Sequence, residues 1–329
     1  MNIIGNDLPT IYADMNLYRY VAYGEVEVAD FESFKWVYSH VHLDEMARTG
    51  NTDALEGMRL LGAVEVCDVL DKNFASVGNV VLNGYVDPDE RYRQHLEAVS
   101  GFEDSDSTSV EVLLRIFGAD NFAELSLTPE MLREEVDRLT GDLEDGQRSS
   151  LLDQADSAAV EFQKTIDVHM SERQPIDRTR LAMGINSGDR HKAEACESPI
   201  EEIWKIIEPA MGEVTLDQFF GFTPHPALAE IPHTQHGILG GAHIILNLLG
   251  ISPDRGMAKR DKIRNIMSDS QHLGMASYCN ALISSDKRFI NKARAIYTYV
   301  KSKTNTLHIP YDPEGITVYI GTREAETGA

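Results

Sequence analysis

Four carboxylate residues stand beside short apolar segments near the two ends of the chain. Asp14 follows the segment TIYA, and Asp286 closely follows the segment ALIS. Glu45 lies in an early helical segment, and Asp269 lies in the helical segment that precedes ALIS. In parallel α/β sheets, ligands bind outside the carboxyl ends of the strands. Carboxylates gathered there would repel one another unless a hard divalent cation, Mg²⁺ or Mn²⁺, lay between them.

Each of these residues also has an ordinary structural explanation. An aspartate after a strand is commonly the N-cap of the next helix, and Asp286 directly precedes a helical segment. His272, three residues after Asp269, and His42, three residues before Glu45, have the spacing of ordinary surface or core histidines. The combination of the residues and their order in the chain favour a common site over these separate explanations.

Short apolar strands and helical segments alternate at both ends of the chain. Alternating apolar residues predict strands at residues 10–13, 63–70, 281–284, 307–310 and 315–321, and the stretch 34–49 is predicted to pass from a strand into a helix at Ser39. Further helices are predicted over residues 17–25, 51–61, 128–140, 151–170, 199–211, 232–250, 259–267, 269–279 and 287–303. The alternation predicts an α/β fold with a parallel sheet.

Charged residues are distributed unevenly along the chain. The formal net charge is −23, which argues against a general nucleic-acid coat because phosphate binding usually requires a basic surface. Residues 254–303 nevertheless hold eleven Lys and Arg against four Asp, a net charge of +7 in a block that includes Asp269 and Asp286. The middle of the chain, from about Tyr85 to Gly221, is acidic and mostly helical by period. The composition predicts three segments, residues 1–84, 85–249 and 250–329.

Three stretches resemble the motifs of the PIN-domain family of metal-dependent ribonucleases. IYADMNLY resembles the first-strand motif, an apolar strand that ends in Asp with Asn two residues later. SHVHLDEM resembles the early-helix motif that contributes a Glu, and DSQHLGMASYCNALISSDKRF resembles the paired third and fourth motifs. The resemblance covers roughly residues 8–70 and 240–310. It implies a three-layer α/β/α domain with a central parallel sheet.

Carried over residue by residue, the resemblance implies an acidic quartet that holds Mg²⁺ or Mn²⁺, namely Asp14, Glu45, Asp269 and Asp286. Asp44 stays open as the alternative to Glu45. The supporting polar groups would be Asn16, His42, His272 and Ser285. The candidate contacts to substrate phosphates are Lys259, Arg260, Lys262, Arg264, Lys287 and Arg288. The chain departs from the compact family form, because the 224 positions from Glu45 to Asp269 imply a large, mainly helical insertion.

The implied activity is metal-dependent endonucleolytic hydrolysis of RNA, which leaves a 5′-phosphate and a 3′-hydroxyl. A second hypothesis is a PIN-like scaffold with little catalysis, which recruits a protein partner through the acidic insertion. A phosphohydrolase of small phosphate esters is disfavoured, because ADMN lacks the second Asp of a DxD motif. The choice between RNA and DNA, an inhibitory or regulatory protein partner and homo-oligomerisation stay open.

Other features exclude several classes of protein and site. No apolar run reaches the roughly 20 residues needed to cross a bilayer, and the first residues lack a signal-peptide pattern, so we expect a cytoplasmic protein. The three cysteines are far apart and are predicted to be buried thiols. Zinc is disfavoured at His225, His233, His236 and His243 because their spacing fits no standard site. The glycines of GILGGAH, residues 237–243, predict close helix packing rather than a phosphate loop.

Overall fold

The computed structural model describes two compact units. The described residues are 8–72, 76–100, 175–224, 234–257, 259–310 and 316–319, with scattered positions between 101 and 174. The first unit comprises Met1–Gly101, Ser187–Pro253 and Ile266–Ala329, and the second comprises Phe102–Asn186 and Asp254–Asn265. Most of the predicted helices over 128–140 and 151–170 lies outside the described residues, as do His225 and His233.

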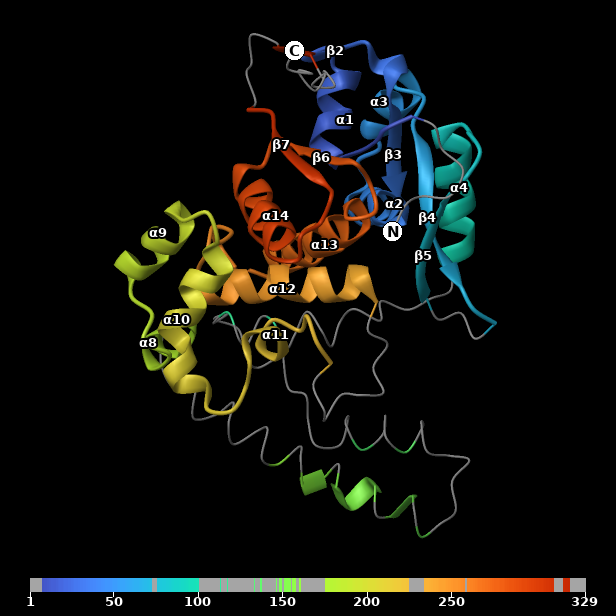
Figure 1. Ribbon diagram of the computed structural model, residues 1–329. Helices are drawn as coiled ribbons and strands as arrows, with labels where there is room; N and C mark the ends of the chain where they lie inside the picture. The colour runs from blue at the N-terminus through green and yellow to red at the C-terminus, as the bar shows by residue number, and fades with distance from the viewer. Residues whose placement is uncertain are drawn as a thin grey trace, which may run out of the picture. The chain divides into compact units, whose positions relative to one another are not determined.

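A six-stranded sheet forms the centre of the first unit (Figure 1). Its order is β5-β4-β3-β1-β6-β7, and every neighbouring pair is parallel except β4 and β5, which are antiparallel. The strands are β1 (Thr10–Ala13), β3 (Lys35–Ser39), β4 (Val64–Leu70), β5 (Ser76–Leu82), β6 (Ala281–Ser284) and β7 (Asn305–His308). A separate parallel pair joins β2 (Val26–Ala29) to β8 (Ile316–Tyr319).

Helices flank this sheet and extend beyond it. Those of the first unit are α1 (Met15–Ala22), α2 (His40–Thr49), α3 (Ala54–Leu60), α4 (Pro88–Val99), α9 (Ser187–Ala195), α10 (Pro199–Met211), α11 (Leu216–Phe219), α12 (Gln235–Leu249) and α14 (Lys287–Tyr299). A short 3₁₀ turn spans Phe31–Ser33, and α8 (Pro175–Ala182) lies in the second unit. Helix α13 (Arg260–Ala276) begins in the second unit's segment and continues into the first.

The side chains of β1 alternate between the two faces of the sheet, as the period of a strand requires. Ile11 and Ala13 belong to the hydrophobic core that includes side chains of α1, α2 and α3. Tyr12 lies on the opposite face, where its partners across the sheet are Val37 on β3 and Leu282 on β6. All five side chains are fully buried, so the central strands are covered on both faces.

The chain changes direction across the sheet beside β1. After β1 it adds β3 and β4 on one side, whereas β6 and β7 lie on the other side. Such a switch point leaves a crevice at the carboxyl ends of the central strands, where α/β proteins bind ligands. The backbone N–H of Asp14 donates to the carbonyl oxygen of Ile283 at 3.0 Å, which joins the ends of β1 and β6 at this switch point.

Two glycines allow α12 and α13 to pack closely. A Cβ on Gly274 would lie 2.6 Å from the carbonyl oxygen of His236, and one on Gly240 would lie 3.1 Å from that of Ser270. Close helix packing by the glycine-rich stretch is therefore confirmed at Gly240. The contact fixes α13 along α12 and so determines which of its side chains face the sheet.

The structure confirms several sequence-based predictions and corrects others. Strands β1 and β6 have their predicted bounds, and Ser39, Gly250 and Asp286 cap the predicted helices. The sheet is mixed rather than wholly parallel, because β5 turns back along β4. The two helices predicted over 259–267 and 269–279 form the single helix α13, since no helix-breaking residue separates them. The predicted strand at 315–321 pairs with β2 outside the main sheet.

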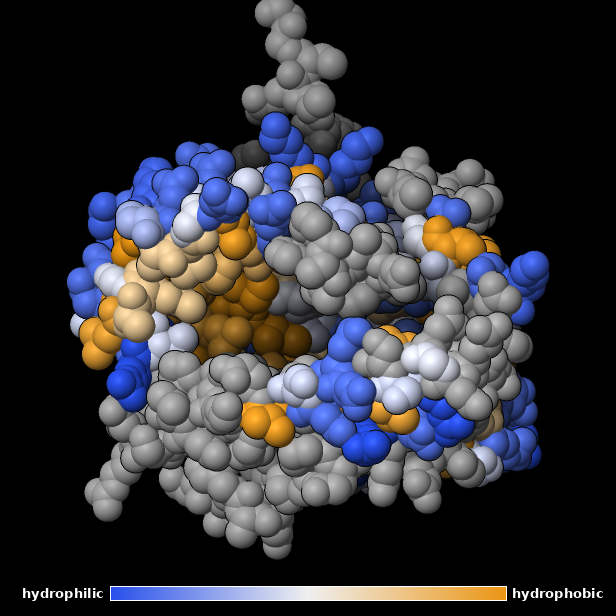
Figure 2. Space-filling view, turned by 90° about the horizontal axis from the view of Figure 1, so that it is seen from below, coloured by the Kyte–Doolittle hydropathy of each residue, from blue (hydrophilic) through white to orange (hydrophobic). Residues whose placement is uncertain are grey.

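The described surface contains both polar and apolar regions. Seen from below, apolar side chains gather on one side of the molecule and hydrophilic ones border them (Figure 2). Among the described residues, every helix is too short or too polar to cross a membrane.

Candidate active site

Asp14 is held at the carboxyl end of β1 by two hydrogen bonds. Its Oδ1 accepts from the backbone N–H of Leu17 at 2.9 Å and so caps α1, and its Oδ2 accepts from the hydroxyl of Ser284. The side chain is buried, with 7% of the residue exposed. Burial raises the pKa of Asp14, and the nearby charge of Glu45 raises it further, despite the two hydrogen bonds. A cation beside this carboxylate would reverse that effect.

Glu45 projects from α2 toward the same edge. Its Oε2 lies 3.5 Å from Nε2 of His272 and accepts from the hydroxyl of Ser268 at 3.4 Å. Burial alone would raise the pKa of Glu45, but a protonated His272 outweighs burial and lowers this pKa to about 2, an effect that a neutral His272 does not exert. The neighbouring Asp44 points elsewhere, because its Oδ1 contacts Nε2 of His95 at 2.9 Å. The geometry therefore favours Glu45 over Asp44 as the acid of this site.

Asp286 is the N-cap of α14, which is the ordinary explanation considered for it above. Its Oδ1 accepts from the backbone N–H groups of Arg288 and Phe289 at 2.7 and 3.1 Å. Its own N–H donates to Oγ of Ser284 at 2.9 Å, and the same hydroxyl donates to Asp14. Ser284 therefore links the two aspartates at the switch point, and Asp286 itself is exposed to solvent.

Asp269 has different neighbours from His272, which lies three residues later on α13. One of its carboxylate oxygens is within 4.8 Å of a ring nitrogen of His243, a fully buried residue of α12. Burial and the charge of Lys292 on α14 lower the pKa of His243 well below its ordinary value. Among the described residues, no three of the four predicted carboxylates have oxygens that all lie within 4.8 Å of one another. One cation bound by the whole quartet would require these side chains to move.

The sequence did not indicate a buried network of hydrogen-bonded polar side chains next to the carboxylates. The hydroxyl of Tyr12 lies 2.7 Å from Oγ of Ser39 and 2.7 Å from Nδ1 of His272. His42 is fully buried beside them, and its Nε2 donates to the carbonyl oxygen of Ala13 at 2.9 Å. His42 thus has a structural role and is not exposed to a substrate. The only sequence signal for this network was the hydroxyl-bearing residue Tyr12 within a buried strand.

The remaining predicted residues lie in different places. Asn16 is half-buried in the first turn of α1, and the carbonyl oxygen of Ser285 accepts from Nε2 of His308 at 3.2 Å. Lys287 and Arg288 form the first turn of α14, directly after Asp286, where Lys287 is exposed and Arg288 half-exposed. Four further predicted phosphate contacts belong to the second unit, namely Lys259, Arg260, Lys262 and Arg264.

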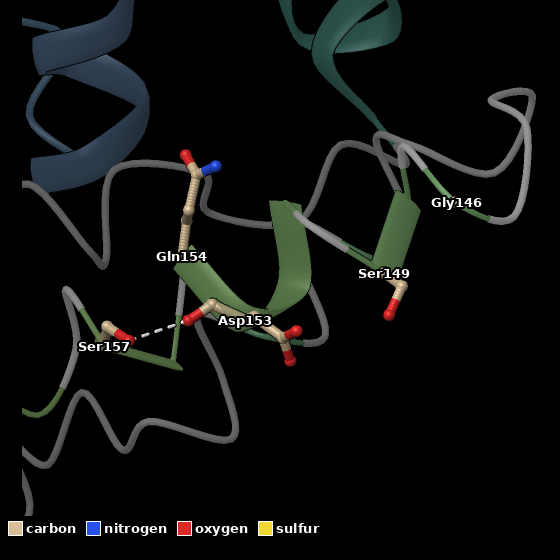
Figure 3. A pocket seen from close by; sticks show the side chains of 5 residues that line it. All are labelled: Gly146, Ser149, Asp153, Gln154 and Ser157. Atoms are coloured by element: carbon tan, nitrogen blue, oxygen red, sulfur yellow. Dashed lines mark hydrogen bonds between the residues drawn. The ribbon is translucent and has the colours of Figure 1, made fainter.

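A pocket in the second unit contains none of the predicted residues. It is lined by Gly146, Ser149, Asp153, Gln154 and Ser157, and the Ser157 hydroxyl donates to the carbonyl oxygen of Asp153 at 2.9 Å (Figure 3). Its small and polar lining offers no charged pair or imidazole for chemistry.

Comparisons with known proteins assign no relative to this chain. No protein-family model matches it, and neither the curated proteins nor the solved structures contain a match. Its function must therefore be inferred from the residues and the geometry.

Proposed function

We propose that this protein is a PIN-like, metal-dependent endoribonuclease that acts at the carboxyl edge of β1 and β6. The observation that carries the proposal is the position of Asp14 and Asp286 after two adjacent parallel strands, on either side of the switch point. Glu45 adds a third carboxylate from α2, the helix that follows the other neighbour of β1. The proposed fold is a three-layer domain whose two parts are separated in the sequence by a large insertion.

The residues of this edge fit a divalent cation. Asp14 is a buried carboxylate whose pKa is raised partly by the charge of Glu45, so a cation would stabilise both. His272 is buried beside Glu45, and among the described residues its Nε2 has no hydrogen-bond partner. Asp14 and Glu45 would hold Mg²⁺ or Mn²⁺, with Asp286 at the rim. A cation bound there would supply an activated water and neutralise charge on the phosphodiester oxygens.

The side chains around the carboxylates orient them and attract the substrate. The hydroxyl of Ser284 and the N–H of Leu17 fix both oxygens of Asp14, so this group is already oriented before any ligand arrives. Lys287 is exposed directly beside Asp286, where its ammonium would contact a substrate phosphate. This local positive charge makes an RNA substrate compatible with a strongly acidic chain.

Neutralising Glu45 or its neighbour Asp44, one at a time, tests the proposal. We expect Glu45→Gln to lower cleavage of labelled RNA in Mn²⁺ by about 10- to 100-fold, because it removes a charge from the site. Asp44→Asn is the matched control and should cleave within about twofold of wild type, since Asp44 contacts His95 instead. Initial rates on single-stranded and structured RNAs would measure the effect. A wild-type protein that cleaves neither RNA, or equal rates for the two variants, would refute the proposal.

The scaffold hypothesis stays a prediction. It depends on the acidic insertion, and most residues from 101 to 174 lie outside the described part of the chain. No contact of the described residues favours it over hydrolysis.

A further inference from the structure

We propose that His272 is a nitrogen ligand of the cation, held in place by Tyr12, and that the site therefore prefers Mn²⁺ to Mg²⁺. The inference rests on the proposed function, because it concerns the same edge of the sheet. It replaces an all-carboxylate site by a mixed site built from Asp14, Glu45 and His272. The ligand atoms of these three residues do not all lie within 4.8 Å of one another, so their side chains would draw together on binding. Three structural observations support it: the hydrogen bonds of the buried imidazoles, the position of Nε2, and the rigidity of α13.

The hydrogen bonds of His42 establish its tautomer. The backbone N–H of Ser39 donates to Nδ1 of His42 at 3.1 Å, so Nδ1 carries a lone pair and no proton. The proton is therefore on Nε2, which donates to the carbonyl oxygen of Ala13. Nδ1 of His42 also lies 3.4 Å from the Tyr12 hydroxyl, which is closer to Ser39 and His272.

The hydroxyl of Tyr12 has one proton, and its two closest partners, Ser39 and His272, lie at the same distance of 2.7 Å. If it donates to Nδ1 of His272, the proton of that ring is on Nε2 and points toward Glu45. If it donates to Ser39, it accepts from Nδ1–H of His272, and Nε2 then presents a bare lone pair. The two arrangements differ in the tautomer of His272 as well as in the orientation of the two hydroxyls, and both leave the imidazole neutral. Tyr12 thus allows His272 to become a metal ligand without ionising.

The position of Nε2 agrees with the second arrangement. Its contact with Oε2 of Glu45, at 3.5 Å, is too long or too poorly directed to be a hydrogen bond. Only 2% of His272 is exposed, so water does not satisfy the nitrogen readily. An unsatisfied buried nitrogen is costly, whereas a metal-ligating histidine has its other nitrogen hydrogen-bonded to a fixed partner. Tyr12 is such a partner at Nδ1.

The helix that carries His272 is held from two sides. Gly274 packs against the backbone of His236 on α12, and the hydroxyl of Tyr297 on α14 donates to the carbonyl oxygen of Leu273 at 2.6 Å. These contacts flank His272 in sequence, and the ring stacks edge-on against His42 with centroids 4.4 Å apart. Imidazole is a better ligand for transition metals than for Mg²⁺, which prefers oxygen. A fixed imidazole beside carboxylates therefore favours Mn²⁺.

Electron spin-echo spectroscopy of bound Mn²⁺ tests the inference, because it detects a directly coordinated nitrogen. The sample is the tag-free, full-length protein with sub-stoichiometric Mn²⁺, compared with His272→Gln and with His95→Gln as the matched control. We expect a nitrogen coupling in the wild type and in His95→Gln, and none in His272→Gln. Tyr12→Phe should keep the coupling but raise the Mn²⁺ dissociation constant, measured by calorimetry, about tenfold. The wild-type dissociation constant for Mg²⁺ should exceed that for Mn²⁺ at least about tenfold.

The outcomes separate this inference from the proposed function. RNA cleavage by a wild type that shows no nitrogen coupling, or a coupling that persists in His272→Gln, would overturn the inference and leave the nuclease standing. A coupling lost only in His272→Gln, in a protein that cleaves no RNA, would support the ligand and reject the nuclease. Failure of the wild type to bind Mn²⁺ would overturn both. Should His272→Gln not fold, unchanged Mn²⁺ affinity in Tyr12→Phe would count against the inference.

Discussion

Replacing Asp14 with asparagine is expected to lower RNA cleavage on the order of 1,000-fold, because loss of a cation site removes several kcal/mol of charge stabilisation. Asparagine keeps the shape of the side chain and can still accept the N–H of Leu17, so α1 keeps its cap. The loss would therefore reflect charge rather than folding. Initial rates in saturating Mn²⁺, with urea unfolding of the same samples, measure the two effects separately.

The companion variant Asp286→Asn should lose less activity, about 10- to 100-fold, because Asp286 is exposed at the rim rather than buried. Asparagine is as good an N-cap as aspartate, so the start of α14 should be unaffected. The order of the two effects is itself informative, since it follows from burial. Cleavage by both variants at the wild-type rate would rule out this edge as the active site.

Replacing Gly57 with alanine is expected to destabilise the first unit by about 3 kcal/mol or more, because it forces extra volume into a packed contact. A Cβ at Gly57 on α3 would lie 1.9 Å from the carbonyl oxygen of Tyr18 on α1. The backbone of one helix cannot move aside without shifting the other. Because α1 begins directly after Asp14, the same variant should also weaken binding of the cation. Urea denaturation followed by circular dichroism gives the free energy of unfolding.

Gly241→Ala is the matched control for this prediction. Gly241 is also inside a helix, α12, but a Cβ there would meet nothing within 4 Å. Alanine should then stabilise by roughly 0.5–1 kcal/mol through its higher helix propensity. Opposite signs for the two variants would show that the α1–α3 contact, and not glycine replacement in general, causes the loss. Equal effects would contradict the close approach of the two helices.

Local sequence patterns predicted the parts of the site that depend on neighbouring residues. Strand β1 and the cap at Asp14 follow from an apolar run that ends in an acid, and β6 with Asp286 repeats the pattern. Their position at the same edge of the sheet also followed, because parallel strands place their carboxyl ends at one edge. Ser39 was recognised as an N-cap for the same local reason.

The features that sequence patterns did not predict depend on long-range packing. The i, i+4 pair Ser268 and His272 faces Glu45, whereas Asp269 faces His243 on α12. The contact of Gly274 with α12 sets this rotation of α13, and no local pattern encodes it. The bond between Tyr12 and His272 joins residues 260 positions apart, and β5 pairs antiparallel with β4 at the sheet edge.

The most direct test of the account is the location of Mn²⁺ in crystals of the protein. Anomalous diffraction from crystals soaked in Mn²⁺ identifies the ion independently of any assay. We predict a peak at the carboxyl edge of β1, in contact with Asp14 and Glu45 and lost in Asp14→Asn. A peak that is absent there, or that lies only beside Asp269 and His243, would contradict the account.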